Sequence, residues 1–101
     1  MKEEELKRVS NPLKVFENAR RVYGGNTQIF ISNRKDKKYM IYNPFNNKFV
    51  HFGQMGYEDY TKHGDQERRN NYLNRTSKIK GDWRNDKYSP NNLSRFLLWD
   101  A

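Results

Sequence analysis

Residues 52–99 read FGQMGYEDYTKHGDQERRNNYLNRTSKIKGDWRNDKYSPNNLSRFLLW. This stretch combines closely spaced glycines, a series of tyrosines, a basic segment with helical periodicity and an apolar tail that ends in tryptophan. Asp65 is a good N-cap, and residues 66–79 are predicted to form a helix that Gly81 ends. The helix would pack on a sheet through one stripe, which consists of Arg69, Tyr72, Leu73, Thr76 and Ile79.

A second, shorter helix is predicted at the end of this stretch, over residues 90–99. Ser89 and Pro90 supply a cap and a first-position proline in the favourable order. Apolar residues then follow at helical spacing, at positions 93, 96 and 97. The expected core candidates of the whole stretch are its large aromatic side chains, namely Phe52, Tyr72, Trp83 and Trp99.

Upstream of this stretch, three short segments rich in strand-forming residues alternate with polar turns. The predicted strands are residues 28–32, 38–42 and 48–52, joined by turns at 33–37 and 43–47. Such short connections favour antiparallel pairing, so we expect a three-stranded meander. In the third strand, Phe49 and His51 would point to one face, and Val50 and Phe52 to the other.

The first residues of the chain predict helical structure. Residues 2–8 are consistent with either a short charged helical turn or a solvated tail. Ser10 or Asn11 can cap a predicted helix over residues 12–23, which Pro12 begins and Gly24 and Gly25 end. The expected fold class is therefore α+β: a three-stranded antiparallel meander with two or three short helices packed on it. Residues 1–27 would form an N-terminal helical extension of a small domain at 28–101.

Composition limits the classes of protein to consider. Only 34% of the residues are hydrophobic, but 15% are aromatic, so a small core of aromatic side chains is expected. The chain has no cysteine, which excludes disulfides and thiol chemistry. No apolar run is long enough to span a bilayer, and the charged N-terminus does not resemble a signal peptide. We therefore expect no membrane span.

Catalytic and metal-binding patterns are weak. His63 lies close in sequence to Asp59, Asp65 and Glu67, a spacing compatible with an oxygen-rich metal site. Helix capping already explains Asp65, and a favourable first-turn charge explains Glu67. No zinc spacing, nucleophile elbow or phosphate-binding glycine loop occurs. The sequence predicts no enzyme activity, no cofactor, no metal and no small-molecule substrate.

The charge balance indicates an acidic partner. The formal net charge is +8, and basic residues alternate with tyrosine and tryptophan. Lysine and arginine can pair with phosphates, and exposed aromatic rings can stack on bases. The 34–38 turn is the strongest candidate for a phosphate contact, because it carries four basic side chains and one aspartate. The predicted contacts to nucleic acid or to an acidic partner are Arg34, Lys35, Lys37, Lys38, Arg68, Arg75, Lys78 and Arg84.

One ordered set of residues carries a family resemblance. It comprises Phe52-Gly53, Gly56-Tyr57, Asp59-Tyr60-Thr61, His63, Asp65, Arg68, Tyr72, Arg75, Trp83 and Leu97-Leu98-Trp99, with Ser32 to Tyr39 as a lead-in. This set resembles a family of small domains of unknown function encoded by large double-stranded DNA viruses. The resemblance covers about residues 32–99. It implies a viral setting and no particular activity.

Together, these observations predict a non-enzymatic structural protein of a large DNA virus. It would be a minor capsid or core component, located in the virion and in the host cell cytoplasm during assembly. Its partners would be other virion proteins or packaged double-stranded DNA. The alternative is a free-standing, sequence-tolerant, chromatin-like DNA-binding protein. A continuous basic stripe would favour DNA binding, whereas scattered charges and an exposed apolar patch would favour assembly.

Overall fold

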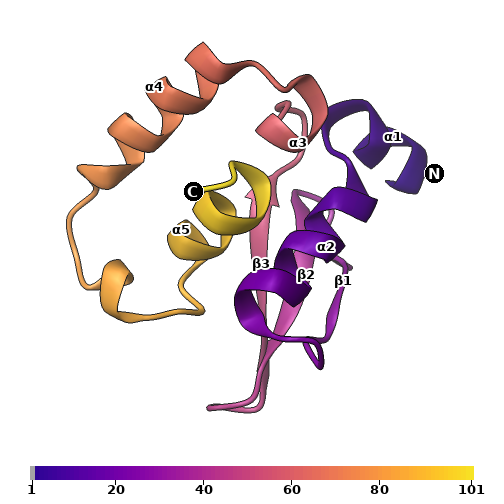
Figure 1. Ribbon diagram of the computed structural model, residues 1–101. Coiled ribbons are helices and arrows are strands. Elements are labelled where there is room, and N and C mark those ends of the chain that lie inside the picture. The colour runs from indigo at the N-terminus through magenta and orange to yellow at the C-terminus, as the bar shows by residue number, and fades with distance from the viewer. Residues whose placement is uncertain (1) are drawn as a thin grey trace.

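The computed structural model describes residues 2–101. The chain forms a small three-stranded sheet with short helices packed on one side of it (Figure 1). In chain order the elements are α1 (Lys2–Val9), α2 (Pro12–Tyr23), β1 (Ile29–Ile31), β2 (Lys37–Asn43), β3 (Lys48–Gln54), α3 (Tyr60–His63), α4 (Gln66–Ser77), the 3-10 turn η1 (Trp83–Asn85), α5 (Pro90–Leu93) and the π-helical turn η2 (Ser94–Leu98).

The three strands form the predicted antiparallel meander, in the order β1-β2-β3. Tyr39 lies opposite Phe52, and Ile41 lies opposite Val50. Tyr39, Ile41 and Phe52 are almost completely buried, so they mark the inner face of the sheet. Phe49 and His51 lie at alternate positions along β3 and belong to the outer face. The α+β class and the predicted facing of the third strand are confirmed.

Helices at both ends of the chain cover the inner face. In Figure 1, α2 lies in front of the strands, and α5 lies beside β3. Val15 and Ala19 of α2 meet Leu93 and Leu97 of the C-terminal segment in one buried core. Leu6 of α1 is also fully buried there. The residues predicted as an N-terminal extension therefore share a core with the rest of the domain, so α1 is an integral helix rather than a solvated tail.

The prediction that α4 packs on the sheet is wrong. In Figure 1, α4 stands away from the strands, and its partner is the C-terminal segment. The ring of Tyr72 stacks on Trp99, with centroids 4.2 Å apart and planes 9° apart. Arg95 Nη1 donates to the Leu73 carbonyl at 2.8 Å. The apolar stripe also ends early, because Ile79 follows the helix and is 47% exposed.

The helix signals read from the sequence act as expected. Asn11, Asp65 and Ser89 each accept a backbone hydrogen bond at the start of a helix. The C-terminal helix differs from its prediction: it is α-helical only to Leu93 and then continues as the wider turn η2. Of the predicted core aromatics, Phe52 and Trp99 are buried. Trp83 and Tyr72 are only partly buried.

Candidate functional site

The tip of the β1–β2 hairpin holds four of the predicted contact residues. Arg34 and Lys35 are exposed, and Lys37 is half-buried. Lys38 is different, because its relative exposure is only 2%. Its ammonium group points inward to a carboxylate and to backbone carbonyls. The prediction that Lys38 contacts an external phosphate is therefore wrong, and the rest of the turn remains available to solvent.

Lys38 forms a buried ion pair with Asp59. Its Nζ lies 3.0 Å from Asp59 Oδ2 and donates to the Tyr57 carbonyl at 2.6 Å. Thr61 donates to the other carboxylate oxygen. Burial lowers the pKa of Lys38, and the charge of Asp59 opposes this shift. The pair joins β2 to the segment before α3. Its two residues are 21 positions apart in the sequence.

A hydroxyl cluster continues from this ion pair toward α1. Ser10 Oγ lies 2.7 Å from the Tyr39 hydroxyl and 3.3 Å from Thr61 Oγ1. All three side chains are buried, and burial raises the pKa of Tyr39. Because each hydroxyl has a partner, the cluster holds the α1–α2 junction, β2 and α3 together without an unsatisfied buried group. Its evident role is structural.

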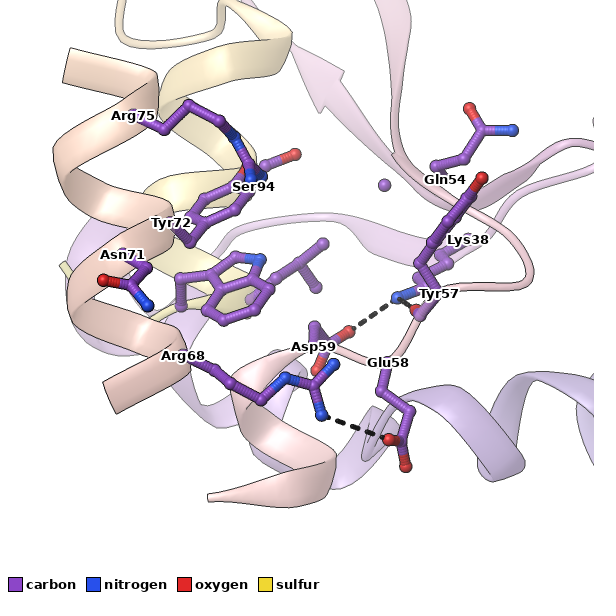
Figure 2. Close-up of a pocket in the computed structure, with 13 residues that line it drawn as sticks. Lys38, Gln54, Tyr57, Glu58, Asp59, Arg68, Asn71, Tyr72, Arg75 and Ser94 are labelled. Atoms are coloured by element: carbon purple, nitrogen blue, oxygen red, sulfur yellow. Dashed lines mark hydrogen bonds and ion pairs between the residues drawn. The ribbon is translucent and has the colours of Figure 1, made fainter. Parts of the chain in front are cut away.

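A cleft opens beside the ion pair (Figure 2). It lies between α4 and the edge of the sheet where β2 begins and β3 ends. Its volume is about 450 Å³. The α4 wall presents Arg68, Asn71, Tyr72 and Arg75, which follow one another at helical spacing. In Figure 2, Gln54, Tyr57 and Glu58 lie across from them. We call this hollow the α4 cleft.

Charges in the α4 cleft are only partly balanced. Arg68 Nη1 lies 3.4 Å from Glu58 Oε1, and Lys38 is paired with Asp59, as the dashed lines in Figure 2 mark. The guanidinium of Arg75 lies over the ring of Tyr72, at 5.5 Å from its centroid. None of the three ion pairs among residues 2–101 includes Arg75. One cation of the cleft therefore lacks an acidic partner.

The remaining predicted contacts, Lys78 and Arg84, lie beyond the end of α4. Both are exposed. Arg84 stacks over the ring of Trp83 at 4.3 Å and donates to the Ser77 carbonyl. The guanidinium of Arg95 lies 5.4 Å from the centroid of the same ring, so two guanidinium groups contact one indole. Arg95 was not among the predicted contacts, because its position within an apolar helical pattern gave no sign of its orientation.

Three of the four side chains that could have formed a metal site, those of Asp59, His63 and Asp65, make other contacts. Asp59 is paired with Lys38, and Asp65 caps α4. His63 Nδ1 accepts from the Asp65 amide at 2.9 Å, which requires the neutral ring. Within residues 2–101, no group of three or more histidine, aspartate or glutamate side chains is placed to hold a metal ion. The arrangement of the α4 cleft suits binding, since charged, amide and aromatic groups line it.

The outer face of the sheet forms a second candidate surface. Phe30 and Phe49 are 45% and 44% exposed, respectively. Their rings are 6.1 Å apart, and Tyr42 lies 5.5 Å from Phe49. Met40 lies opposite both Phe30 and His51 in the strand register. We call these residues, Phe30, Met40, Tyr42, Phe49 and His51, the outer sheet face.

Comparison with known proteins places part of this chain in context. Residues 27–76 match a family of unknown function (DUF5754). The match supports a small domain of unknown function and covers the sheet, α3 and most of α4. The closing residues 97–99 of the resemblance lie outside it. No curated protein and no solved structure matches the chain. Within residues 2–101, no helix has the length and apolar character needed to cross a membrane.

Proposed function

We propose that this protein is a non-enzymatic structural component of a large DNA virus, either a minor capsid protein or a core protein. It would contact other virion proteins through the outer sheet face, and acidic protein surface or packaged DNA through its basic side chains. The viral attribution rests on the motif resemblance over residues 32–99. The expected locations are the virion and, during assembly, the host cell cytoplasm.

The observation that carries this proposal is the exposed aromatic surface of the outer sheet face. Phe30 and Phe49 each leave nearly half of their surface in solvent. Covering the exposed part of one such ring contributes roughly 2 kcal/mol, from about 25 cal/mol per Å² and typical phenylalanine areas. Grouped apolar side chains of this kind mark interaction surfaces more often than isolated ones do.

The distribution of charge supports the same proposal. The predicted basic contacts come from separate places: the hairpin tip, α4 and the η1 turn. Two of them, Lys38 and Arg68, already have acidic partners within the chain. The remaining cations suit contacts with acidic surface at several points. Partner binding without chemistry is also consistent with the lining of the α4 cleft.

Incorporation into particles provides the test. Cells infected with the source virus would express a tagged copy, and purified particles would be analysed by quantitative mass spectrometry. The double variant Phe30→Ser/Phe49→Ser is expected to reduce incorporation at least about tenfold, the factor for 1.4 kcal/mol. Leu13→Ser is the matched control, because Leu13 is 69% exposed and lies on α2. Equal incorporation of all three proteins, or absence of the wild-type chain from particles, would refute the proposal.

A second candidate function is sequence-tolerant DNA binding. It is favoured by the net charge of +8 and by the exposure of Arg34, Lys35, Arg75, Lys78 and Arg84. Binding to a short random-sequence duplex across a salt series tests it. Each phosphate contact should contribute about 0.9 to the log–log slope, and Lys35→Ala with Lys37→Ala should reduce that slope. No binding at low salt would leave assembly as the only candidate.

A further inference from the structure

The α4 cleft has an apolar floor between polar walls. Leu98 and Trp99 line it from the C-terminal segment, and Tyr72 stacks on Trp99 from the α4 side. These side chains are fixed by the core, since Leu98 and Trp99 are buried at 2% and 8% exposure. An apolar or aromatic group entering the cleft would therefore meet a preformed surface, which reduces the entropic cost of binding.

The walls add a cation and neutral hydrogen-bonding groups. Arg75 extends from α4 along the upper part of the cleft in Figure 2, near Ser94. Its guanidinium rests on the Tyr72 ring and has no ion-pair partner among the described residues. The exposed amides of Asn71 and Gln54 line opposite walls. A planar guanidinium of this kind recognises a carboxylate through two parallel hydrogen bonds.

Charge in the cleft selects among anionic ligands. Glu58 and Asp59 line the same cleft as Arg75. Their partners Arg68 and Lys38 neutralise them, so the cleft offers one uncompensated positive charge. A polyphosphate or a nucleic-acid strand would bring several negative charges next to two carboxylates. A ligand with one carboxylate neutralises the single uncompensated positive charge of Arg75.

From these features we infer that the α4 cleft binds an acidic peptide segment of a partner protein. The segment presents one carboxylate to Arg75 and an adjacent aromatic or aliphatic side chain to Leu98 and Trp99. The amides of Asn71 and Gln54 hydrogen-bond to its backbone. The inference goes beyond the proposed function, because it rests on the cleft alone and holds even if the outer sheet face binds nothing.

A small-molecule titration isolates this recognition. N-acetylphenylalanine carries one carboxylate beside an aromatic ring, N-acetylphenylalaninamide is its neutral counterpart, and AMP carries an aromatic base with a phosphate. Each would be added to the isotope-labelled full chain while NMR follows the indole N–H signals. Trp99 lines the cleft, and Trp83 lies outside it as the internal control. We expect saturable shifts at Trp99 with the carboxylate, and at most weak shifts with the other two probes.

Three variants then test the role of the cation. Arg75→Gln should weaken binding of the carboxylate at least about tenfold, the expected loss for a charge-assisted hydrogen bond. Arg75→Lys should retain part of the affinity, because it keeps the charge and loses the planar fork. Lys80→Gln, exposed, outside the cleft and not among the predicted contacts, should bind as the wild type does. The inference is overturned if the amide binds equally well, if AMP binds more tightly, or if Trp99 gives no saturable shift.

Discussion

Replacement of Lys38 by methionine removes one member of the buried ion pair and keeps the length of the side chain. The ammonium group of Lys38 donates three hydrogen bonds: one to Asp59 at 3.0 Å, one to the Tyr57 carbonyl at 2.6 Å and one to the Val9 carbonyl at 3.5 Å. In the variant the Asp59 carboxylate stays buried at 1% exposure, with Thr61 as its remaining side-chain donor. An uncompensated charge is thus left in the interior.

The expected cost is large for a domain of this size. Removing one partner of a buried ion pair typically destabilises a protein by about 3–5 kcal/mol. The total unfolding free energy of a domain is about 5–15 kcal/mol. Lys38→Met should therefore remove a large part of the free energy of unfolding. The double variant Lys38→Met/Asp59→Leu should recover about 2 kcal/mol, because no charge remains buried. It should still be less stable than the wild type, since two carbonyls lose their donor.

Urea unfolding followed by tryptophan fluorescence measures these differences. With a slope of about 1.5 kcal/mol per molar urea, a loss of 3 kcal/mol lowers the midpoint by about 2 M. Lys37→Met is the matched control: Lys37 is the preceding residue of β2, half-buried and without an ion pair. It should change stability by less than about 0.5 kcal/mol. A loss below 1 kcal/mol in Lys38→Met, or strict additivity of the two substitutions, would refute the assigned role.

Two further predictions concern backbone and protonation. Gly53→Ala should cost about 2–5 kcal/mol in urea unfolding, because φ is +81° and the added Cβ would lie 3.0 Å from Leu98. Gly56→Ala, at φ +93° in open space, should cost only about 1–2 kcal/mol; equal losses would exclude the contact as the cause. Burial lowers the pKa of His63 from 6.5, and protonation would break its bond from the Asp65 amide. The contribution of His63 to folding stability should thus be fully present above pH 6.5, and it should be lost as the pH falls through the lowered pKa. An NMR titration that places the pKa above 6.5 would contradict this.

Local signals in the sequence were sufficient for most of the secondary structure. The helix at 12–23 has the predicted bounds, because Asn11, Pro12 and Gly24 act at its ends regardless of the rest of the chain. The three strands alternate with short polar turns, so their antiparallel pairing required no long-range information. The facing of Phe49 and Phe52 followed from the period of two residues along a strand.

The α4 cleft could not be predicted in the same way. Its lining comes from β2, β3, the segment before α3, α4 and the C-terminal segment, so its geometry depends on tertiary packing. Lys38 stands in a row of basic residues that indicates a solvated turn. Its burial depends on Asp59, a residue distant in sequence. The stripe on α4 was recognised, but periodicity alone does not say whether the helix packs on the sheet or on Trp99.

The central claim is that the outer sheet face binds another virion protein. Cross-linking from this face is the most direct test. A photo-reactive phenylalanine analogue at Phe49 would be irradiated in infected cells, and cross-linked products would be identified in purified particles. An analogue at Leu13, which lies on α2 and is 69% exposed against 44% for Phe49, serves as the control. The account predicts one defined virion protein cross-linked from position 49 and none from position 13. Absence of the chain from particles, or the same products from both positions, would contradict it.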